Sequence, residues 1–112
     1  LVEEERAVSI TLSMLQDRIP GSFTAIAPRS ARIRLSDLPG ATIQERRRIE
    51  IEGSGLSASE YLLTAAADAT IDERSFLVPS LGANIFAVTL DRSVLKAGET
   101  ARVIVVRRGA AQ

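Results

Sequence analysis

The chain has 112 residues, of which 46% are hydrophobic and 25% are charged, the proportions of one soluble globular domain. Fourteen basic and fourteen acidic residues give a formal net charge of zero, so no overall field attracts nucleic acid or an anionic membrane. Cysteine and histidine are both absent, which excludes disulfides, thiolate metal sites and any Ser-His-Asp or Cys-His catalytic site within the chain. No apolar run approaches the roughly 20 residues of a membrane-spanning helix. We therefore expect no cofactor, no nucleic-acid partner and no membrane insertion.

The first predicted element is a strand over residues 7–14. Apolar residues alternate there with Ser9, Thr11 and Ser13, a period of two that is typical of a half-buried strand. The alternative is a helix over residues 1–16, which the glutamates at positions 3–5 favour, because acidic residues stabilise a helix N-terminus. The β-branched content of the segment favours the strand.

Alternation continues along the chain, interrupted by turn residues. Strands are predicted at 22–27, 30–35, 47–53, 75–79, 84–90 and 101–107. Residues 36–42 are expected to form a loop, and residues 60–67 fit either a helix or a strand, with the strand preferred. Tight corners are expected at Pro79–Gly82 and at 96–99, because proline and glycine suit the torsions of turns.

About eight short strands at this spacing predict an all-β protein, a single immunoglobulin-like antiparallel β-sandwich of about seven to eight strands. The domain would span residues 1–112, with 1–6 and 108–112 as candidate flexible arms. One side of each strand would be buried between the two sheets. The expected core residues are Ile10, Leu12, Ile33, Ile49, Ile51, Tyr61, Leu63, Phe86, Val88, Leu90, Val103 and Val105.

The C-terminal half carries a resemblance. The segment "FLVPSLGANIFAVTL" followed by "LKAGETARVIVVRR" resembles the last strands of bacterial immunoglobulin-like modules, over roughly residues 60–108. The Cys and Trp pair of antibody-type domains is missing. The resemblance implies a non-catalytic spacer or adhesive module of a surface or periplasmic protein, and it assigns no site residues.

One short motif suggests chemistry. Ser93 and Lys96 match the Ser-x-x-Lys pattern, in which a lysine one helical turn away activates a serine nucleophile. That chemistry requires the serine at the start of a helix inside a large cleft. Here Lys96 runs directly into Ala97 and Gly98, so a loop between strands is favoured. We expect no catalytic residues, and no carboxylates have the spacing of a calcium loop.

The densest charge cluster is "ERRRIEIE" at 45–52. A partner-binding hypothesis assigns a cationic contact for an acidic partner to Arg46, Arg47 and Arg48, next to the loop with Leu38. The alternative is a solvated strand face, on which Arg48, Glu50 and Glu52 point the same way. In that case Arg32 and Arg34 of a neighbouring strand would pair with the glutamates, and such exposed pairs contribute little.

Two functions fit these observations. The first is a non-catalytic interaction or spacer module of a bacterial extracytoplasmic or surface assembly, in the periplasm or on the cell surface. The alternative is a structural virion protein, a phage decoration, capsid or tail component that acts through oligomeric packing. The partner in either case is another protein or further copies of the chain.

Overall fold

The computed structural model describes residues 3–18, 23–35, 38–53, 55–78, 81–82 and 84–109. An α-helix is followed by strands and the 3-10 helix η1, and the strand pairs of the described residues are all antiparallel. The elements are α1 (Glu3–Leu15), β1 (Phe23–Ile26), β2 (Arg32–Leu35), β3 (Leu38–Ile51), β4 (Leu56–Ala65), β5 (Ala69–Thr70), η1 (Glu73–Phe76), β6 (Ile85–Leu90), β7 (Val94–Leu95) and β8 (Thr100–Arg108).

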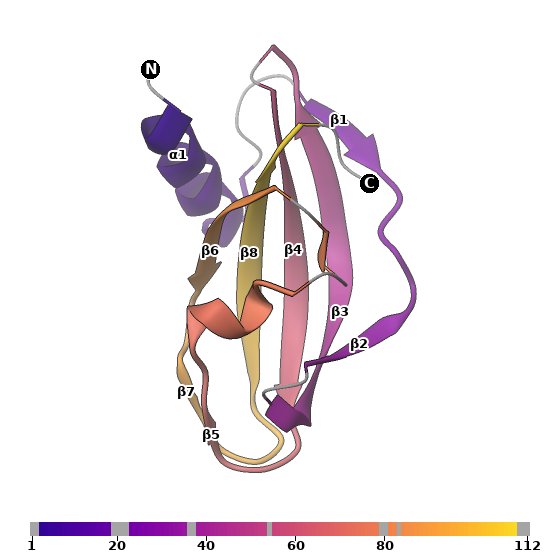
Figure 1. The fold of residues 1–112 in the computed structure, drawn as a ribbon, viewed down its shortest axis with the longest axis vertical. Helices are drawn as coiled ribbons and strands as arrows, with labels where there is room; N and C mark the ends of the chain where they lie inside the picture. The colour runs from indigo at the N-terminus through magenta and orange to yellow at the C-terminus, as the bar shows by residue number, and fades with distance from the viewer. Residues whose placement is uncertain are drawn as a thin grey trace.

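The main sheet has six strands. Five follow the order β1-β3-β4-β8-β6, and the sixth, β2, pairs with the same edge of β3 as β1 does. The long β3 pairs with β1 near its end and with β2 near its start. Strands β5 and β7 form a second sheet of two strands. Figure 1 shows the long strands β3, β4 and β8 running side by side through the middle of the molecule.

Helix α1 lies on one face of the main sheet (Figure 1). Its side chains at positions 7, 10 and 14 are buried, and this 3-4 spacing puts them on one side of the helix. They pack against residues of β3, β4 and β8, among which Ile49, Ala58 and Ile104 are at most 1% exposed. This contact forms the first of two apolar cores.

The second core lies on the opposite face. Residues of β5, η1 and β7, together with Ile71 and Leu81, cover the sheet there. Phe76 of η1 and Leu95 of β7 insert against Ile43, Leu63 and other residues of the long strands. Two antiparallel sheets therefore enclose this core in a sandwich-like arrangement.

A buried arginine anchors the segment that covers the second core. The Arg107 guanidinium donates hydrogen bonds to the Leu81 carbonyl at 2.8 Å, to Ser59 Oγ at 2.8 Å and to the Tyr61 hydroxyl at 2.7 Å. Gly82 has a φ of 99°, and a Cβ there would lie 3.4 Å from Arg107 Nε. A glycine at this position thus permits both the backbone conformation and the approach of Arg107.

The predicted all-β antiparallel class and its seven to eight strands are confirmed. The specifically immunoglobulin-like arrangement remains a prediction. Residues 3–6 of the predicted N-terminal arm lie in α1, and Arg108 of the C-terminal arm lies in β8. Residues 1–2 and 110–112 lie outside the described residues.

The strand predicted over residues 7–14 is wrong, because this segment lies within α1. A strand and a helix would both turn Ile10 and Met14 inward. Only a helix turns Ala7 to the same side, and Ala7 is buried. Leu12 was expected in the core and is 54% exposed on the outer side of the helix.

Two further elements differ from expectation. The strand predicted at 75–79 is a 3-10 helix at Glu73–Phe76, begun by Asp72, whose side chain accepts a hydrogen bond from the Arg74 amide. The loop predicted at 36–42 is already strand from Leu38 onward, because the chain reverses immediately after β2 and pairs with it. The segment 60–67 is strand through Ala65, as preferred.

The predicted corners lie at ends of strands. At 96–99 the Glu99 amide donates to the Lys96 carbonyl at 2.9 Å, which confirms that turn. At Pro79–Gly82 the Leu81 amide donates to the Val78 carbonyl at 3.0 Å, whereas Pro79 and Ser80 lie outside the described residues.

The expected core is largely correct on the central strands. Six of its members are buried, namely Ile10, Ile49, Tyr61, Leu63, Val103 and Val105. Five are half-buried, namely Ile33, Ile51, Phe86, Val88 and Leu90. Three of these five belong to β6, at one edge of the main sheet, where only one neighbouring strand shields them.

Candidate functional site

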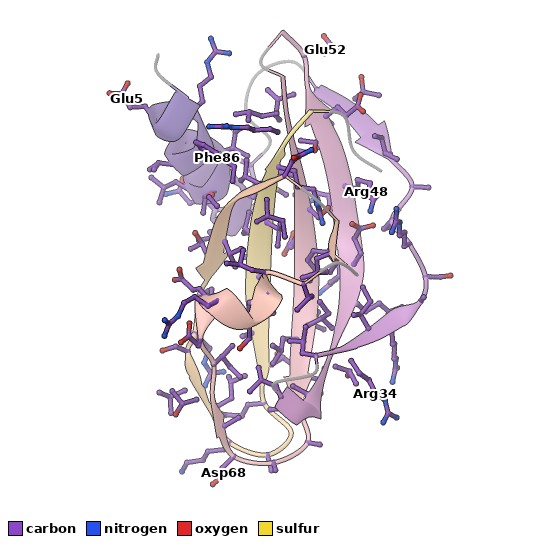
Figure 2. All side chains as sticks on the ribbon, in the orientation of Figure 1. Glu5, Arg34, Arg48, Glu52, Asp68 and Phe86 are labelled. Carbon is purple, nitrogen blue, oxygen red and sulfur yellow. The ribbon has the colours of Figure 1, made fainter. Side chains whose placement is uncertain are left out.

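The structure does not bring the four predicted partner-binding residues together. Leu38 begins β3, eight residues before Arg46, and that length of extended strand spans roughly 26 Å. Leu38 packs at the edge of the second core. Figure 2 shows Arg34, whose strand pairs with the start of β3, well below Arg48 along the long axis of the molecule.

A β-bulge lies within the cluster of three arginines. The pairing register of β3 with β4 shifts between Glu45 and Arg47, so Arg46 is the extra residue. Arg48 is buried and its Nε lies 3.1 Å from Glu45 Oε2. Arg46 is exposed, and Arg47 is half-buried and lies opposite Glu60 on the face covered by α1. Arg47 and Arg48 point to opposite faces because neighbouring residues of a strand alternate, whereas the bulge places Arg46 on the same side as Arg47, where both line one cleft.

The alternative interpretation of the charge cluster is also corrected. Arg32 and Arg34 lie opposite Gln44 and Thr42, not opposite the glutamates of β3. Glu50 lies between Thr24 of β1 and Ser57 of β4. The predicted cross-strand ion pairs do not form, because β2 pairs with the start of β3 and β1 pairs with its end.

The Ser-x-x-Lys pattern does not assemble as a catalytic pair. Val94 and Leu95 between the two residues form β7, so Ser93 and Lys96 are not one helical turn apart. Both are exposed, and the Lys96 amide donates to Glu99 Oε1 at 2.8 Å within the turn.

A different surface has the features of a binding site, namely the free edge of β6. The Asp91 amide donates to the Arg102 carbonyl at 3.1 Å, so these two residues form a hydrogen-bonded pair of the β6-β8 ladder. Hydrogen-bonded and non-hydrogen-bonded pairs alternate in an antiparallel ladder. The N–H and C=O groups of Val88 and Leu90 therefore point away from β8. In the described part of the chain, no strand pairs with this side of β6.

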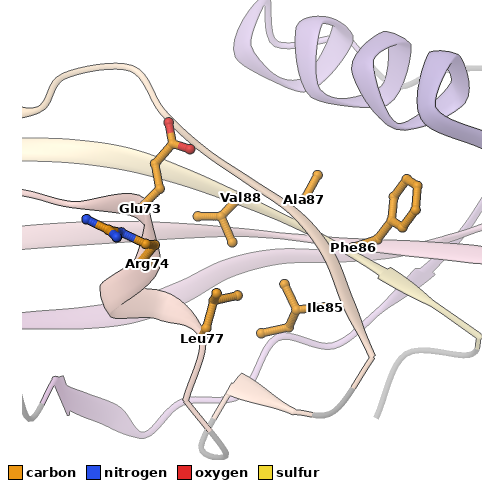
Figure 3. Close-up of a pocket in the computed structure, with 7 residues that line it drawn as sticks. All are labelled: Glu73, Arg74, Leu77, Ile85, Phe86, Ala87 and Val88. Carbon is orange, nitrogen blue, oxygen red and sulfur yellow. The ribbon is translucent and has the colours of Figure 1, made fainter.

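A largely apolar groove of about 280 Å³ runs beside that edge. Figure 3 shows Leu77, Ile85 and Val88 gathered on one side of β6, with Glu73 and Arg74 of η1 at the end of the groove. The lining residues are Glu73, Arg74, Leu77, Ile85, Phe86, Ala87 and Val88. Leu77 is 59% exposed, so a large apolar side chain faces solvent beside unpaired backbone groups.

Polar contacts hold both sides of this groove in place. At the η1 side, the Arg74 guanidinium and its backbone amide both donate to the Asp72 carboxylate. The side-chain hydrogen bond from Arg74 is the main cause that lowers the Asp72 pKa from 3.8 to about 2. At the other end, the Arg108 guanidinium stacks 4.6 Å from the centroid of the Phe86 ring, a cation–π contact.

Sequence reasoning missed this groove. Phe86, Val88 and Leu90 were expected to share one buried face, but the β6-β8 register shifts between Ile85 and Ala87. Figure 3 shows Phe86 and Ala87 on one side of β6, with Ile85 and Val88 on the other. The alternating pattern signals a strand, but it contains no information on which strands are at the edge of a sheet.

The described residues contain no group of three or more acidic side chains placed to hold a metal ion. In the same part of the chain, no helix has the length and apolar character required to cross a bilayer.

The comparisons with known proteins give one result. A search of curated proteins found no match, whereas the family described as TraK C-terminal domain matches residues 1–107. That family is bacterial and related to conjugation. The match contains no indication of a virion protein, and it does not address immunoglobulin-like modules, so that resemblance remains a prediction. Because the match extends over nearly all 112 residues, the chain belongs to the TraK C-terminal domain family.

Proposed function

We propose that the chain is a non-catalytic protein-interaction module of a bacterial conjugation assembly outside the cytoplasm, and that it binds an extended segment of a partner protein along β6. The unpaired edge of β6 beside an apolar groove carries this proposal. Membership of a conjugation-related family supports the setting.

The mode of binding follows from the chemistry of a strand edge. An extended peptide can form main-chain hydrogen bonds with the outward groups of Val88 and Leu90 and thereby add a strand to the sheet. Such bonds contribute affinity for any sequence, whereas side-chain pockets select among sequences. The groove between Leu77 and Val88 suits apolar side chains at alternate positions of the partner segment.

A proline substitution tests the backbone contact. Val88→Pro removes an N–H that points away from β8, so the β6-β8 ladder remains and the loss of unfolding free energy should be smaller than for Thr89→Pro. Partner binding should be lost. The control is Thr89→Pro, which removes an N–H bonded toward β8 and therefore destabilises the fold, as measured by urea unfolding.

A second pair of variants tests the groove. Leu77→Asp places a charge in the groove, whereas Val94→Asp places one at an equally exposed aliphatic residue on β7, where the side chain is 67% exposed. We expect Leu77→Asp to lower conjugation frequency in donor cells and Val94→Asp to leave it unchanged.

Site-specific photo-crosslinking makes the partner visible. A photoreactive residue at position 77 should yield a crosslinked species with another protein of the assembly, and the same residue at position 94 should not. Equal crosslinking at both positions, or a stable Val88→Pro variant with unchanged binding, would contradict the proposal.

A further inference from the structure

A second, polar cleft lies on the face of the sheet that carries α1. Its volume is about 320 Å³. Among the described residues, five charged side chains line it, from the turn after α1 and from β3, β4 and β8: Asp17, Arg46, Arg47, Glu60 and Arg102. It lies apart from the β6 groove, with which it shares no lining residue.

Arg102 makes four hydrogen bonds that hold the cleft together. Its Nε donates to Glu60 Oε2 at 2.6 Å and its Nη2 donates to Asp17 Oδ1 at 3.0 Å. The same guanidinium donates to the carbonyls of Met14 and Leu15 at the end of α1, at 2.7 and 3.0 Å. The Glu60 carboxylate raises the pKa of Arg102, mainly through this hydrogen bond. Four of the five N–H groups of Arg102 therefore fix the walls of the cleft, which leaves one N–H of Nη1.

Arg46 and Arg47 are in the opposite situation. Neither side chain forms a hydrogen bond or an ion pair within the described part of the chain. Nη1 of Arg47 is buried and has no hydrogen-bond partner. A buried donor without an acceptor is costly, and native proteins rarely leave one without a partner.

We infer that this cleft binds a carboxylate, with Arg47 as the principal contact and Arg46 at the rim. Three guanidinium groups and two carboxylates leave one positive charge among the lining residues. A singly charged carboxylate balances that excess, whereas a doubly charged phosphate exceeds it. The planar fork of a guanidinium also donates two parallel hydrogen bonds to the two oxygens of a carboxylate. An acidic side chain or a C-terminus of a partner protein supplies this group.

A titration of the chain tests the inference without knowledge of the partner. Sodium acetate is added to isotopically labelled protein at constant ionic strength, and the Arg47 Nε–H resonance is followed by NMR. We expect a saturable shift with acetate and none with chloride. Tighter binding of inorganic phosphate than of acetate would overturn the carboxylate assignment, and a linear, non-saturating response would overturn the site itself.

Variants identify the arginine that binds. Arg47→Gln should weaken acetate binding roughly ten-fold, whereas Arg47→Lys should restore part of it, because the charge returns without the fork. The matched control is Arg34→Gln, at an exposed strand arginine outside the cleft, which should leave acetate binding unchanged.

Two further variants decide whether acetate binds in the cleft. Should Arg47→Gln fail to fold, Arg46→Gln at the exposed rim should still weaken acetate binding about two- to three-fold. Equal weakening by Arg34→Gln would contradict the inference. Because the cleft and β6 share no residue, this result does not depend on whether a strand binds at β6.

Discussion

Two arginines of β8, five residues apart, attach covering segments to opposite faces of the main sheet. Arg102 holds the end of α1 through the carbonyls of Met14 and Leu15. Arg107 holds the segment before β6 through the Leu81 carbonyl. An odd separation along a strand places two side chains on opposite faces, so one strand anchors both layers.

The surroundings of the two arginines differ. The Arg102 side chain is 24% exposed and has two carboxylate partners, of which Asp17 is 75% exposed. Arg107 is 6% exposed and its guanidinium donates only to neutral oxygens. Water screens the interactions of an accessible charge, so each contributes little to stability. A buried charge has no water to replace a lost partner, so each of its hydrogen bonds contributes more. Arg107 should therefore contribute more to the free energy of unfolding than Arg102, although Arg102 has more ionic contacts.

The largest effect is expected at Arg107. Arg107→Ala leaves the Leu81 carbonyl, Ser59 Oγ and the Tyr61 hydroxyl without their donor and opens a cavity. We expect a loss of roughly 3 kcal/mol in the free energy of unfolding, measured by urea denaturation. The control is Arg34→Ala, which should change stability by less than about 0.5 kcal/mol. If Arg107→Ala were as mild as that control, the ranking of the two anchors would be wrong.

The second-largest loss of stability is expected at Arg102. Arg102→Ala removes the donors to the last carbonyls of α1 and leaves Glu60, whose side chain is only 7% exposed, without its ion pair. We expect a loss of about 2 kcal/mol. Hydrogen exchange should accelerate at the last amides of α1 and remain unchanged in η1.

A double-mutant cycle sharpens the Arg102 prediction. In the Arg102→Ala background, Glu60→Gln should cost less than in the wild type, because the unpaired carboxylate is then removed. Additive effects would show that the ion pair itself does not hold the helix.

This pair of anchors also shows what the sequence could and could not predict. The strands were readable wherever alternation and turn residues agreed, as at β6 and β8. Helix α1 was not, because Val8, Ile10, Leu12 and Met14 satisfy a period of two while the helical period selects Ala7, Ile10 and Met14. Its C-terminal carbonyls are satisfied by Arg102 of β8 rather than by a basic residue of its own last turn, a long-range contact that no local pattern contains.

The candidate sites were less predictable for a related reason. The arginine cluster at 46–48 was visible, but the bulge groups Arg46 with Arg47 rather than with Arg48, and only the pairing with β4 reveals that bulge. The β6 edge depends on strand order, because a strand with the same sequence in the middle of a sheet would have no free hydrogen-bonding groups. Both features are properties of pairing rather than of composition.

A small effect is expected at Asp17, the exposed partner of Arg102. Asp17→Asn removes the ion pair but preserves a residue type that tolerates the positive φ of 59° at this position. Because the carboxylate is 75% exposed, the change in unfolding free energy should be below about 0.5 kcal/mol. A loss comparable to that of Arg102→Ala would show that the helix end is held mainly through Asp17.

The smallest effect concerns the ion pair at the start of η1, on the segment that Arg107 anchors. The Asp72 pKa is lowered from 3.8 to about 2, first by the side-chain hydrogen bond from Arg74. A lowered carboxyl pKa stabilises the fold above the unfolded value, and this contribution is lost as the pH falls from about 4 through 2. Arg74→Gln should return the Asp72 pKa most of the way toward 3.8, since only the backbone donor remains. The measurement is an NMR titration of the Asp72 carboxyl carbon. An unchanged pKa would assign the shift to the backbone amide of Arg74 instead. Because both side chains of the pair are exposed, the free energy of unfolding at neutral pH should barely differ between Arg74→Gln and the wild type.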